Sequence, residues 1–345
     1  MTRRSLLSGG LALALRREKF DQAVGLIQRQ VDSGVVAAAV LRVQSGGETF
    51  AKAFGAAPSP KAVFLLASIT KPMTASAVMV LADRKELSIA DPVQKYIPEF
   101  RGGERDRVTI RHLLTHTSGL PDMLPQNEEL RKRHAPLKSF VAGACSTPLL
   151  FSPGKKVSYQ SMGILLAAEI VERITRRRLP DFLQDQIFRP LGMRDTSLGL
   201  GGRPLAATMQ SQVDDPTNWD WNSPYWRNLA APWGGALAPA GDVSRLLHYF
   251  AAPDRPVLQP ATVHAMISNQ TPGMNPPWGL GWKVEKGFGK ECSSRTFGHY
   301  GSTGTLAWLD PEKSLSFVLL TTKPAAVSEK LLLDPVSDIV SEARR

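Results

Sequence analysis

Apolar residues fill almost every position of one short stretch in the first third of the chain. Residues 74–82 read TASAVMVLA, and a helix that is apolar on all sides is a buried helix. Pro72 fits such a helix only in its first turn, where a missing N–H costs nothing. The pattern therefore predicts a buried helix that begins near Ser68, with Lys71 one turn further on and on the same face.

The remaining pattern divides the chain into a strand-containing start, a helical middle and a strand-rich end. At the start we expect a helix at residues 17–33 and strands at 35–43 and 49–54. In the middle we expect helices at residues 109–114, 163–175, 180–189 and 242–250. At the end we expect strands at residues 280–284, 296–299, 305–310 and 315–321, and a last helix from Asp334 to about Arg344.

Strands at both ends of the chain, with helices between them, imply one sheet that is assembled from both termini. The predicted fold class is α+β, an antiparallel sheet flanked by helices, with an inserted all-helical lobe. We expect residues 17–75 and 225–345 to form the sheet domain and residues 76–224 to form the mostly helical inserted domain.

Residues 1–16 form either a leader or a disordered extension. Residues 2–7 resemble a twin-arginine export signal, and a short apolar run follows them. Arg16 and Arg17 come directly after that run, which is unusual for a leader, so both interpretations stay open. A functional signal would make the protein exported or periplasmic, and otherwise it would be cytoplasmic. No other stretch of the sequence is long and apolar enough to span a membrane.

The composition is that of an ordinary globular protein, with 43% hydrophobic and 21% charged residues in 345. A formal net charge of +11 would suit a nucleic acid or an anionic surface. The basic residues are scattered, however, and no zinc-finger or RNA-binding signature accompanies them, so we expect no nucleic-acid partner.

Metal and disulfide chemistry find little support in the sequence. Cys145 and Cys292 define no disulfide framework and no metal site, and whether they pair stays open. His112 and His116 have the spacing of a zinc-binding H-E-x-x-H helix, but Leu113 stands where the glutamate should be. We therefore expect no metal.

Residues 199–241 are rich in Gly, Pro and Trp and show little periodicity. A long irregular segment inside a compact protein is often functional. Its aromatic side chains either wall a substrate cleft or pin the loop to the body of the protein, and the sequence favours neither. They are Trp219, Trp221, Tyr225, Trp226 and Trp233.

The candidate chemistry begins with Ser68. A serine hydroxyl is a poor nucleophile until a base takes its proton, and Lys71 can do so only if its pKa is depressed by burial or nearby positive charge. Tyr159, just before the helix at residues 163–175, is a second candidate for the proton transfer. Each has an ordinary alternative, since most serines at a helix start are caps and most tyrosines there are packed.

A glycine-flanked strand near the C-terminus supplies the last element. Its sequence, FGHYGSTGT at residues 297–305, has three glycines that let a ligand approach the backbone. His299 alone would more often be a structural histidine. Here the Ser302 N–H could pair with the Ser68 N–H as an oxyanion hole.

Taken in order, these motifs resemble the serine β-lactamase and penicillin-binding-protein superfamily. The resemblance covers most of the chain from about residue 17 and is strongest to class C β-lactamases, DD-peptidases and family VIII esterases. The motifs that carry it are SITK from Ser68, IRHLLTHTSGL from Ile110, Pro153-Gly154 before Tyr159, Gly234-Gly235, GLGW from Gly279, and HYG from His299. No G-x-S-x-G string occurs, which excludes an α/β-hydrolase.

The resemblance implies an acyl-enzyme on Ser68, with Lys71 as general base and no metal or organic cofactor. Tyr159 matches the tyrosine of the family's Y-x-N motif, which passes a proton to the leaving group and later activates the deacylating water. His299 matches the lysine of the K-T-G strand. Gly301 matches its glycine, and Ser302 the residue whose amide completes the oxyanion hole.

Two departures from the family pattern bear on the substrate. Ser161 replaces the asparagine of Y-x-N and lacks its amide, and His299 is mostly neutral near pH 7 if its pKa is unperturbed. Both changes favour a small-molecule ester, amide or peptide without the carboxylate of a β-lactam. We expect an esterase or a small-peptide or D-amino-acid amidase. A class C-like β-lactamase or DD-carboxypeptidase is the alternative, and a non-catalytic penicillin-binding-like module is a second one.

Overall fold

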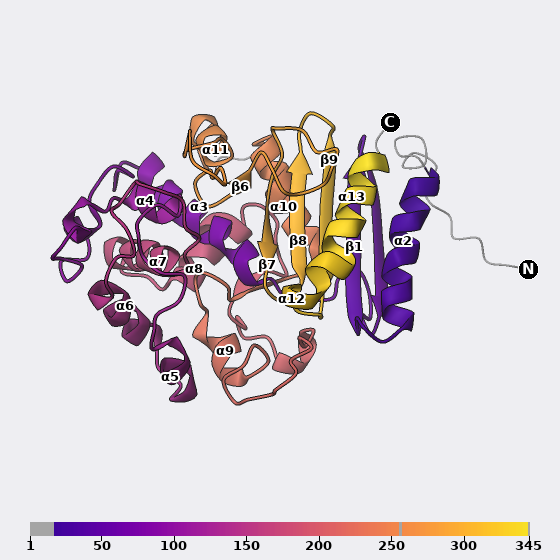
Figure 1. The fold of residues 1–345 in the computed structure, drawn as a ribbon, viewed down its shortest axis with the longest axis horizontal. Helices are drawn as coiled ribbons and strands as arrows, with labels where there is room; N and C mark the ends of the chain where they lie inside the picture. The colour runs from indigo at the N-terminus through magenta and orange to yellow at the C-terminus, as the bar shows by residue number, and fades with distance from the viewer. Residues whose placement is uncertain (1–16, 255–256, 344–345) are drawn as a thin grey trace, which may run out of the picture.

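The main sheet joins strands from the two ends of the chain, as Figure 1 shows in the computed structural model, which describes residues 17–254 and 257–343. Its six strands are antiparallel and follow the order β2-β1-β9-β8-β7-β6. They are β1 (Ala38–Ser45), β2 (Glu48–Gly55), β6 (Lys283–Val284), β7 (Phe297–Gly301), β8 (Thr305–Asp310) and β9 (Leu315–Thr321). This confirms the predicted α+β class and the assembly from both termini. The prediction for residues 1–16 lies outside the described residues.

Helices cover both faces of this sheet, and each face has its own core. On one face, α2 (Arg17–Asp32) and α13 (Asp334–Ala343) pack against each other and against the sheet. On the other face, α10 (Ala240–Ala251) contacts β1, β8 and β9. Side chains alternate along β8, so this strand contributes residues to both cores. Leu306 and Trp308 belong to the core on the α13 side, and Ala307 and Leu309 belong to the opposite core.

The middle of the chain is mostly helical and lies to one side of the sheet (Figure 1). Its helices are α4 (Ile110–Leu114), α5 (Asn127–Lys132), α6 (Leu137–Ser146), α7 (Met162–Thr175), α8 (Leu179–Leu183) and α9 (Pro224–Leu229). A small sheet, β3 (Phe64–Leu65), β5 (Ala236–Ala238) and β4 (Ser197–Leu198), ties this region to the segment before Ser68. The proposed domain boundaries themselves stay a prediction.

The predicted buried helix is α3 (Thr70–Asp83), and every residue from Thr70 to Leu81 is buried. It packs mainly against α7 and lies between the helical region and the sheet. Ser68 lies just before it, in the 3-10 turn Ala67–Ile69. Ala67 has a φ of 47°. This left-handed backbone conformation is energetically unfavourable for any residue that has a side chain. The backbone is therefore held in an unfavourable conformation directly before the candidate nucleophile.

The strand expected at residues 280–284 is much shorter, because only β6 (Lys283–Val284) pairs with β7. Gly281 has a φ of +83°, and its N–H donates to the Leu114 carbonyl instead of to a neighbouring strand. A Cβ on Gly281 would lie 2.5 Å from the Cβ of Ala75. The glycine is therefore needed where the chain packs closely on α3.

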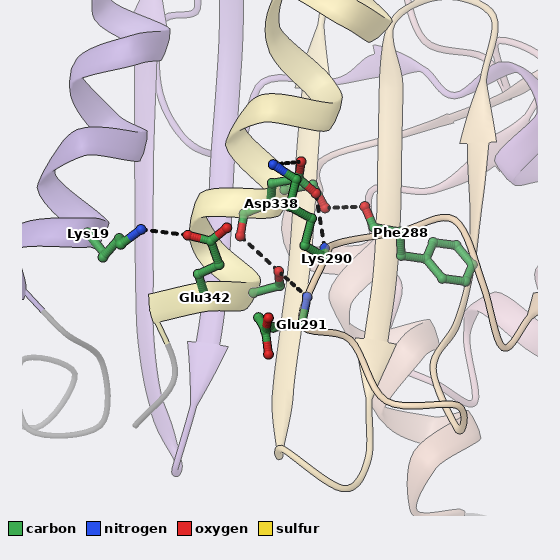
Figure 2. Close-up of polar contacts among 8 residues, drawn as sticks. Lys19, Phe288, Lys290, Glu291, Asp338 and Glu342 are labelled. Atoms are coloured by element: carbon green, nitrogen blue, oxygen red, sulfur yellow. Dashed lines mark hydrogen bonds and ion pairs between the residues drawn. The ribbon is translucent and has the colours of Figure 1, made fainter.

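The last helix fixes the loop between β6 and β7 (Figure 2). The carboxylate of Asp338 accepts from the Lys290 N–H at 3.0 Å, and the Ser341 hydroxyl accepts from the Glu291 N–H at 3.2 Å. The Ser337 hydroxyl donates to the Phe288 carbonyl at 2.9 Å. A π-helical segment, Glu329–Leu333, precedes α13 and was not expected from the sequence.

Two smaller questions from the sequence have structural answers. Cys145 and Cys292 are both free thiols. None of the described helices is long and apolar enough to cross a membrane.

Shortening one side chain in α3 tests how far the buried helix stabilises the fold. We expect Leu81→Ala to lower the free energy of unfolding by about 2–5 kcal/mol, because Leu81 is fully buried and a cavity would remain. The matched control is Leu150→Ala, since that side chain is 65% exposed and should change stability by less than about 0.5 kcal/mol. Urea unfolding measures both, and equal effects would contradict the role given to α3.

Candidate active site

Ser68 opens into a cleft of about 810 Å³ at the free edge of the main sheet. The near end of the cleft contains most of the residues that the sequence singled out. They are Ser68, Tyr159, His299, Gly301 and Ser302, together with Trp278. The far end is lined by Lys283 of β6, the loop that follows it, and the C-terminal helical segments.

Lys71 lies beneath Ser68 and is completely buried. Its Nζ donates to Ser68 Oγ at 3.0 Å and to the Trp233 carbonyl oxygen at 3.0 Å. Burial lowers the pKa of the Lys71 ammonium to about 7, and the nearby charge of Asp122 opposes that shift. A neutral amine within hydrogen-bonding distance of a serine hydroxyl can accept its proton. The Ser68–Lys71 pair therefore has the geometry and the proton affinity that a nucleophile and its base require.

Tyr159 approaches the same pair from the turn before α7. Lys71 Nζ lies 4.7 Å from the centre of its ring. Burial raises the pKa of the Tyr159 hydroxyl well above its ordinary value, and a hydrogen bond with Ser68 opposes this only in part. Tyr159 is therefore a neutral phenol that holds its proton, next to a lysine that releases its own near pH 7.

Strand β7 lies directly against the segment that leads into Ser68. A Cβ on Gly301 would lie 2.2 Å from the Leu66 carbonyl oxygen, so only glycine permits this approach. Beyond it, the hydroxyl of Thr303 donates to the Leu65 carbonyl at 2.6 Å, and that of Thr305 to the Leu66 carbonyl at 2.9 Å. These contacts hold the turn that contains Ser302 beside the residues that precede Ser68.

His299 has a defined tautomer that the sequence could not specify. Its Nδ1 lies 2.6 Å from the Tyr300 carbonyl oxygen, and since a carbonyl only accepts, Nδ1 carries the proton and Nε2 is an acceptor. Burial, together with the charge of Lys71, lowers the pKa of His299 to about 3. The ring is only 3% exposed, and Nε2 has no partner among the described residues. His299 is thus neutral, whereas the lysine it replaces would be a cation.

Ser161 is buried and does not line the cleft. Its hydroxyl donates to the Asp122 carboxylate at 2.6 Å, and its N–H to the Asp122 carbonyl at 3.2 Å. Asp122 itself is exposed. The side chain expected to contact substrate is therefore turned to a neighbouring carboxylate, and sequence reasoning did not identify that carboxylate.

The aromatic residues of the loop at 199–241 do not line the cleft. Trp226 and Trp233 are buried with ring centres 6.2 Å apart, and the Arg131 guanidinium lies 4.2 Å from the Trp226 ring centre. These contacts favour the interpretation that the aromatic residues pin the loop.

The aromatic wall of the near end of the cleft comes from Trp278, which the sequence analysis did not single out. Its ring centre is 5.8 Å from that of Tyr159 and 5.6 Å from that of His299. The His116 ring, 4.4 Å from Trp278, packs behind it and is completely buried. The only signal for Trp278 in the sequence is its position directly before the GLGW motif that begins at Gly279.

The described residues include no group of three or more His, Cys, Asp or Glu side chains that could hold a metal ion. His112 instead caps α4, because Thr109 and His112 exchange side-chain and backbone hydrogen bonds. His116 Nδ1 accepts from the Gln160 N–H at 3.1 Å.

Comparison with known proteins agrees with this arrangement. The model of the Beta-lactamase family matches residues 23–337. Esterase EstB of Burkholderia gladioli is 30% identical over 75% of this chain and 77% of its own. A protein of Salmonella agona (strain SL483) named "Putative D-alanyl-D-alanine carboxypeptidase" is 26% identical, over 89% of this chain and 83% of its own. The solved structure of EstCE1, titled a hydrolase with promiscuous acyltransferase activity, superposes with a TM-score of 0.79 at 21% identity, covering 94% and 99% of the two chains.

The fold and the site together define a β-lactamase-like serine hydrolase. The chain belongs to the Beta-lactamase family, whose members include esterases, amidases and carboxypeptidases.

The pKa of Lys71 sets an expectation for the pH dependence of catalysis. If the neutral amine is the base, kcat/KM should rise tenfold per pH unit below about pH 7 and level off above it, since Lys71 loses its proton there. The raised pKa of Tyr159 predicts no fall in the range where an ordinary tyrosine ionises. A pH–rate profile measured with a neutral ester checks both. A midpoint near the ordinary lysine pKa would contradict the assignment.

The close approach at β7 can be tested with a single methyl group. We expect Gly301→Ala to lower kcat by at least about 100-fold, because the added Cβ displaces β7 and the Ser302 amide from Ser68. Gly241→Ala is the matched control, since that α10 position has no atom within 4 Å of an added Cβ. Steady-state kinetics on both folded variants decide, and an unimpaired Gly301→Ala enzyme would refute this role of β7.

Proposed function

We propose that the protein hydrolyses small esters or amides through an acyl-enzyme on Ser68. The observation that carries this proposal is the 3.0 Å contact between Ser68 Oγ and the amine of Lys71, a lysine that is fully buried and titrates near pH 7. A capping serine would need no such partner. The family membership supports the reaction class, and the 30% identity to an esterase supports an ester substrate.

Acylation follows from the positions of three groups. Lys71 takes the proton of Ser68 as Oγ attacks the substrate carbonyl carbon, and the C=O electron pair moves to the carbonyl oxygen. The N–H groups of Ser68 and Ser302 are our candidates for stabilising that oxyanion. Because β7 lies against Leu66 through Gly301, both amides can face one carbonyl oxygen without a large rearrangement.

Leaving-group departure needs an acid, and Tyr159 is the suitable group. Its phenol keeps its proton in the free enzyme, whereas Lys71 readily gives up its own. Tyr159 protonates the leaving oxygen or nitrogen as the C–O or C–N bond breaks, and Lys71 returns to Tyr159 the proton taken from Ser68. Deacylation reverses these roles, since water then loses a proton as it attacks the acyl carbon and Ser68 regains one.

The polarity of the site favours substrates without a carboxylate next to the scissile bond. His299 is neutral and its free Nε2 is an acceptor, so it offers neither a charge nor a donor to a carboxylate. This supports an esterase, or a small-peptide or D-amino-acid amidase, over a class C-like β-lactamase. A DD-carboxypeptidase remains the second candidate because of the 26% identity to the Salmonella protein of that name.

Covalent labelling tests the nucleophile. A fluorophosphonate probe should label the wild-type protein on Ser68, because the probe phosphorylates serines that a base activates. A folded Ser68→Ala variant should stay unlabelled, and a variant of an exposed serine, Ser33→Ala, should be labelled like wild type. Peptide mass spectrometry locates the adduct. Normal labelling of Ser68→Ala would refute the proposal.

A pair of chromogenic substrates separates an esterase from a β-lactamase. We expect p-nitrophenyl acetate to be hydrolysed with a kcat/KM at least about tenfold above that of nitrocefin, since nitrocefin carries a carboxylate that His299 cannot bind as a cation would. Fast nitrocefin turnover without esterase activity would favour the β-lactamase instead.

A further inference from the structure

His116 lies against Tyr159 and Trp278, in the turn that ends α4. The turn is a Schellman motif, because the Thr117 N–H donates to the His112 carbonyl at 3.0 Å. The residue before the donor in such a motif takes a left-handed conformation and is usually glycine, sometimes asparagine. His116 takes it with a φ of 59° and a fully buried side chain. The turn therefore holds an imidazole where the backbone alone would favour glycine.

Tyr159 lies in a segment that has no regular structure of its own. Residues 156–160 belong to no helix or strand, so regular backbone bonding does not fix the position of Tyr159. His116 binds the backbone on either side of it instead. The His116 carbonyl accepts from the Ser158 N–H at 2.9 Å, and the His116 Nδ1 accepts from the Gln160 N–H at 3.1 Å. One residue thus bonds to both chain neighbours of Tyr159.

The imidazole of His116 also contacts the phenol ring. The ring centres of His116 and Tyr159 are 4.7 Å apart, with an angle of 38° between the planes. Tyr159 in turn is hydrogen-bonded to Ser68. His116 itself does not line the cleft, so any effect that it has on the reaction passes through the groups it packs against.

The bond to Gln160 sets the tautomer of His116. An N–H donates to Nδ1, so Nδ1 is unprotonated, and burial lowers the pKa of His116 well below its ordinary value, which keeps the ring neutral. The proton is then on Nε2, which has no hydrogen-bond partner among the described residues. An unpaired buried donor costs free energy, as does the left-handed backbone. What histidine supplies at this position is an acceptor at Nδ1 and a ring against Tyr159.

We infer that His116 is the positioning residue of Tyr159, and that it holds the phenol where it can protonate the leaving group. This inference rests on the proposed role of Tyr159 as the acid of acylation and extends it. General acid catalysis needs the acid within hydrogen-bonding distance of the departing atom, and a small displacement is enough to lose it. Substrates whose leaving group departs without a proton therefore depend least on His116.

Two acetate esters of similar shape test this dependence. The p-nitrophenoxide of p-nitrophenyl acetate departs with little need of a proton, whereas the more basic p-cresolate of p-tolyl acetate benefits from an acid. We measure kcat/KM, because it reports acylation and both esters then form the same acetyl-enzyme. The readout is the ratio of kcat/KM for p-nitrophenyl acetate to that for p-tolyl acetate. A variant that merely contains less active enzyme lowers both values equally and leaves this ratio unchanged.

The decisive variants are His116→Gly and His116→Asn, which both suit the left-handed turn. His116→Gly removes the acceptor and the ring, and we expect the ratio to rise at least about tenfold, a part of the roughly 100-fold or more that a general acid contributes. His116→Asn places a side-chain oxygen near the position of Nδ1, where it can accept from the Gln160 N–H. Its ratio should return to within about threefold of wild type.

The matched control is His134→Gly. His134 also follows a helix in a left-handed conformation, with a φ of 54°, and its ring stacks on Tyr225 with the ring centres 4.6 Å apart. It does not line the cleft, so the ratio should stay within about twofold of wild type. Tyr159→Phe is the reference, because it removes the acid itself, and its ratio should rise at least as far as that of His116→Gly.

The outcomes separate this inference from the proposed function. An unchanged ratio in His116→Gly beside a raised one in Tyr159→Phe would overturn the inference and leave the acid role of Tyr159 standing. A ratio raised about tenfold in His116→Asn would do the same, and this variant decides the matter even where His116→Gly does not fold. A ratio that Tyr159→Phe also leaves unchanged would instead overturn the proposed acid role, and the inference with it.

Discussion

The burial of Lys71 without a carboxylate partner is the interaction on which the site depends. Both recorded acceptors of its Nζ are neutral oxygens, those of Ser68 and of the Trp233 carbonyl. Desolvation of an ammonium in such a place costs free energy and lowers its pKa, which is what a base at neutral pH requires. Helix α3, which is buried from Thr70 to Leu81, and the aromatic loop, whose Trp233 carbonyl accepts from Nζ, leave this lysine with no exposed surface. Burial thus gives Lys71 the lowered pKa that its proposed role as the base requires.

The sequence predicted those features that depend on order and spacing along the chain. Ser68 and Lys71 lie three apart, so any helical start brings them together, and the apolar run behind them could only be buried. The assembly of one sheet from both termini followed from strands at the two ends. Tyr159 and His299 were placed near Ser68 by resemblance, because nothing in local sequence relates residues so far apart, and the cleft contains both.

What the sequence could not provide are contacts made across the fold. Asp122 and Ser161 meet only because segments 116–122 and 158–161 run side by side. The tautomer of His299 depends on a carbonyl of the next residue, and its low pKa depends on burial against Trp278 and Tyr159. The strand predicted at residues 280–284 is shorter in the structure because the Gly281 N–H bonds to the last carbonyl of α4 and Gly281 packs on α3. These tertiary contacts override strand propensity.

The net charge of the whole chain differs from the balance of charged residues at the cleft. The whole chain carries +11, yet the far end of the cleft presents Lys283 and Lys290 against Glu329, Asp334 and Asp338, and Lys290 is already paired with Asp338. Asp122 adds a further negative charge near the catalytic groups. Since exposed charges beyond about 10 Å are largely screened at ordinary ionic strength, a substrate in the cleft experiences these local groups more than the distant basic surface. A basic protein can thus contain a site that disfavours anions, and the selectivity must be read from the residues at the cleft.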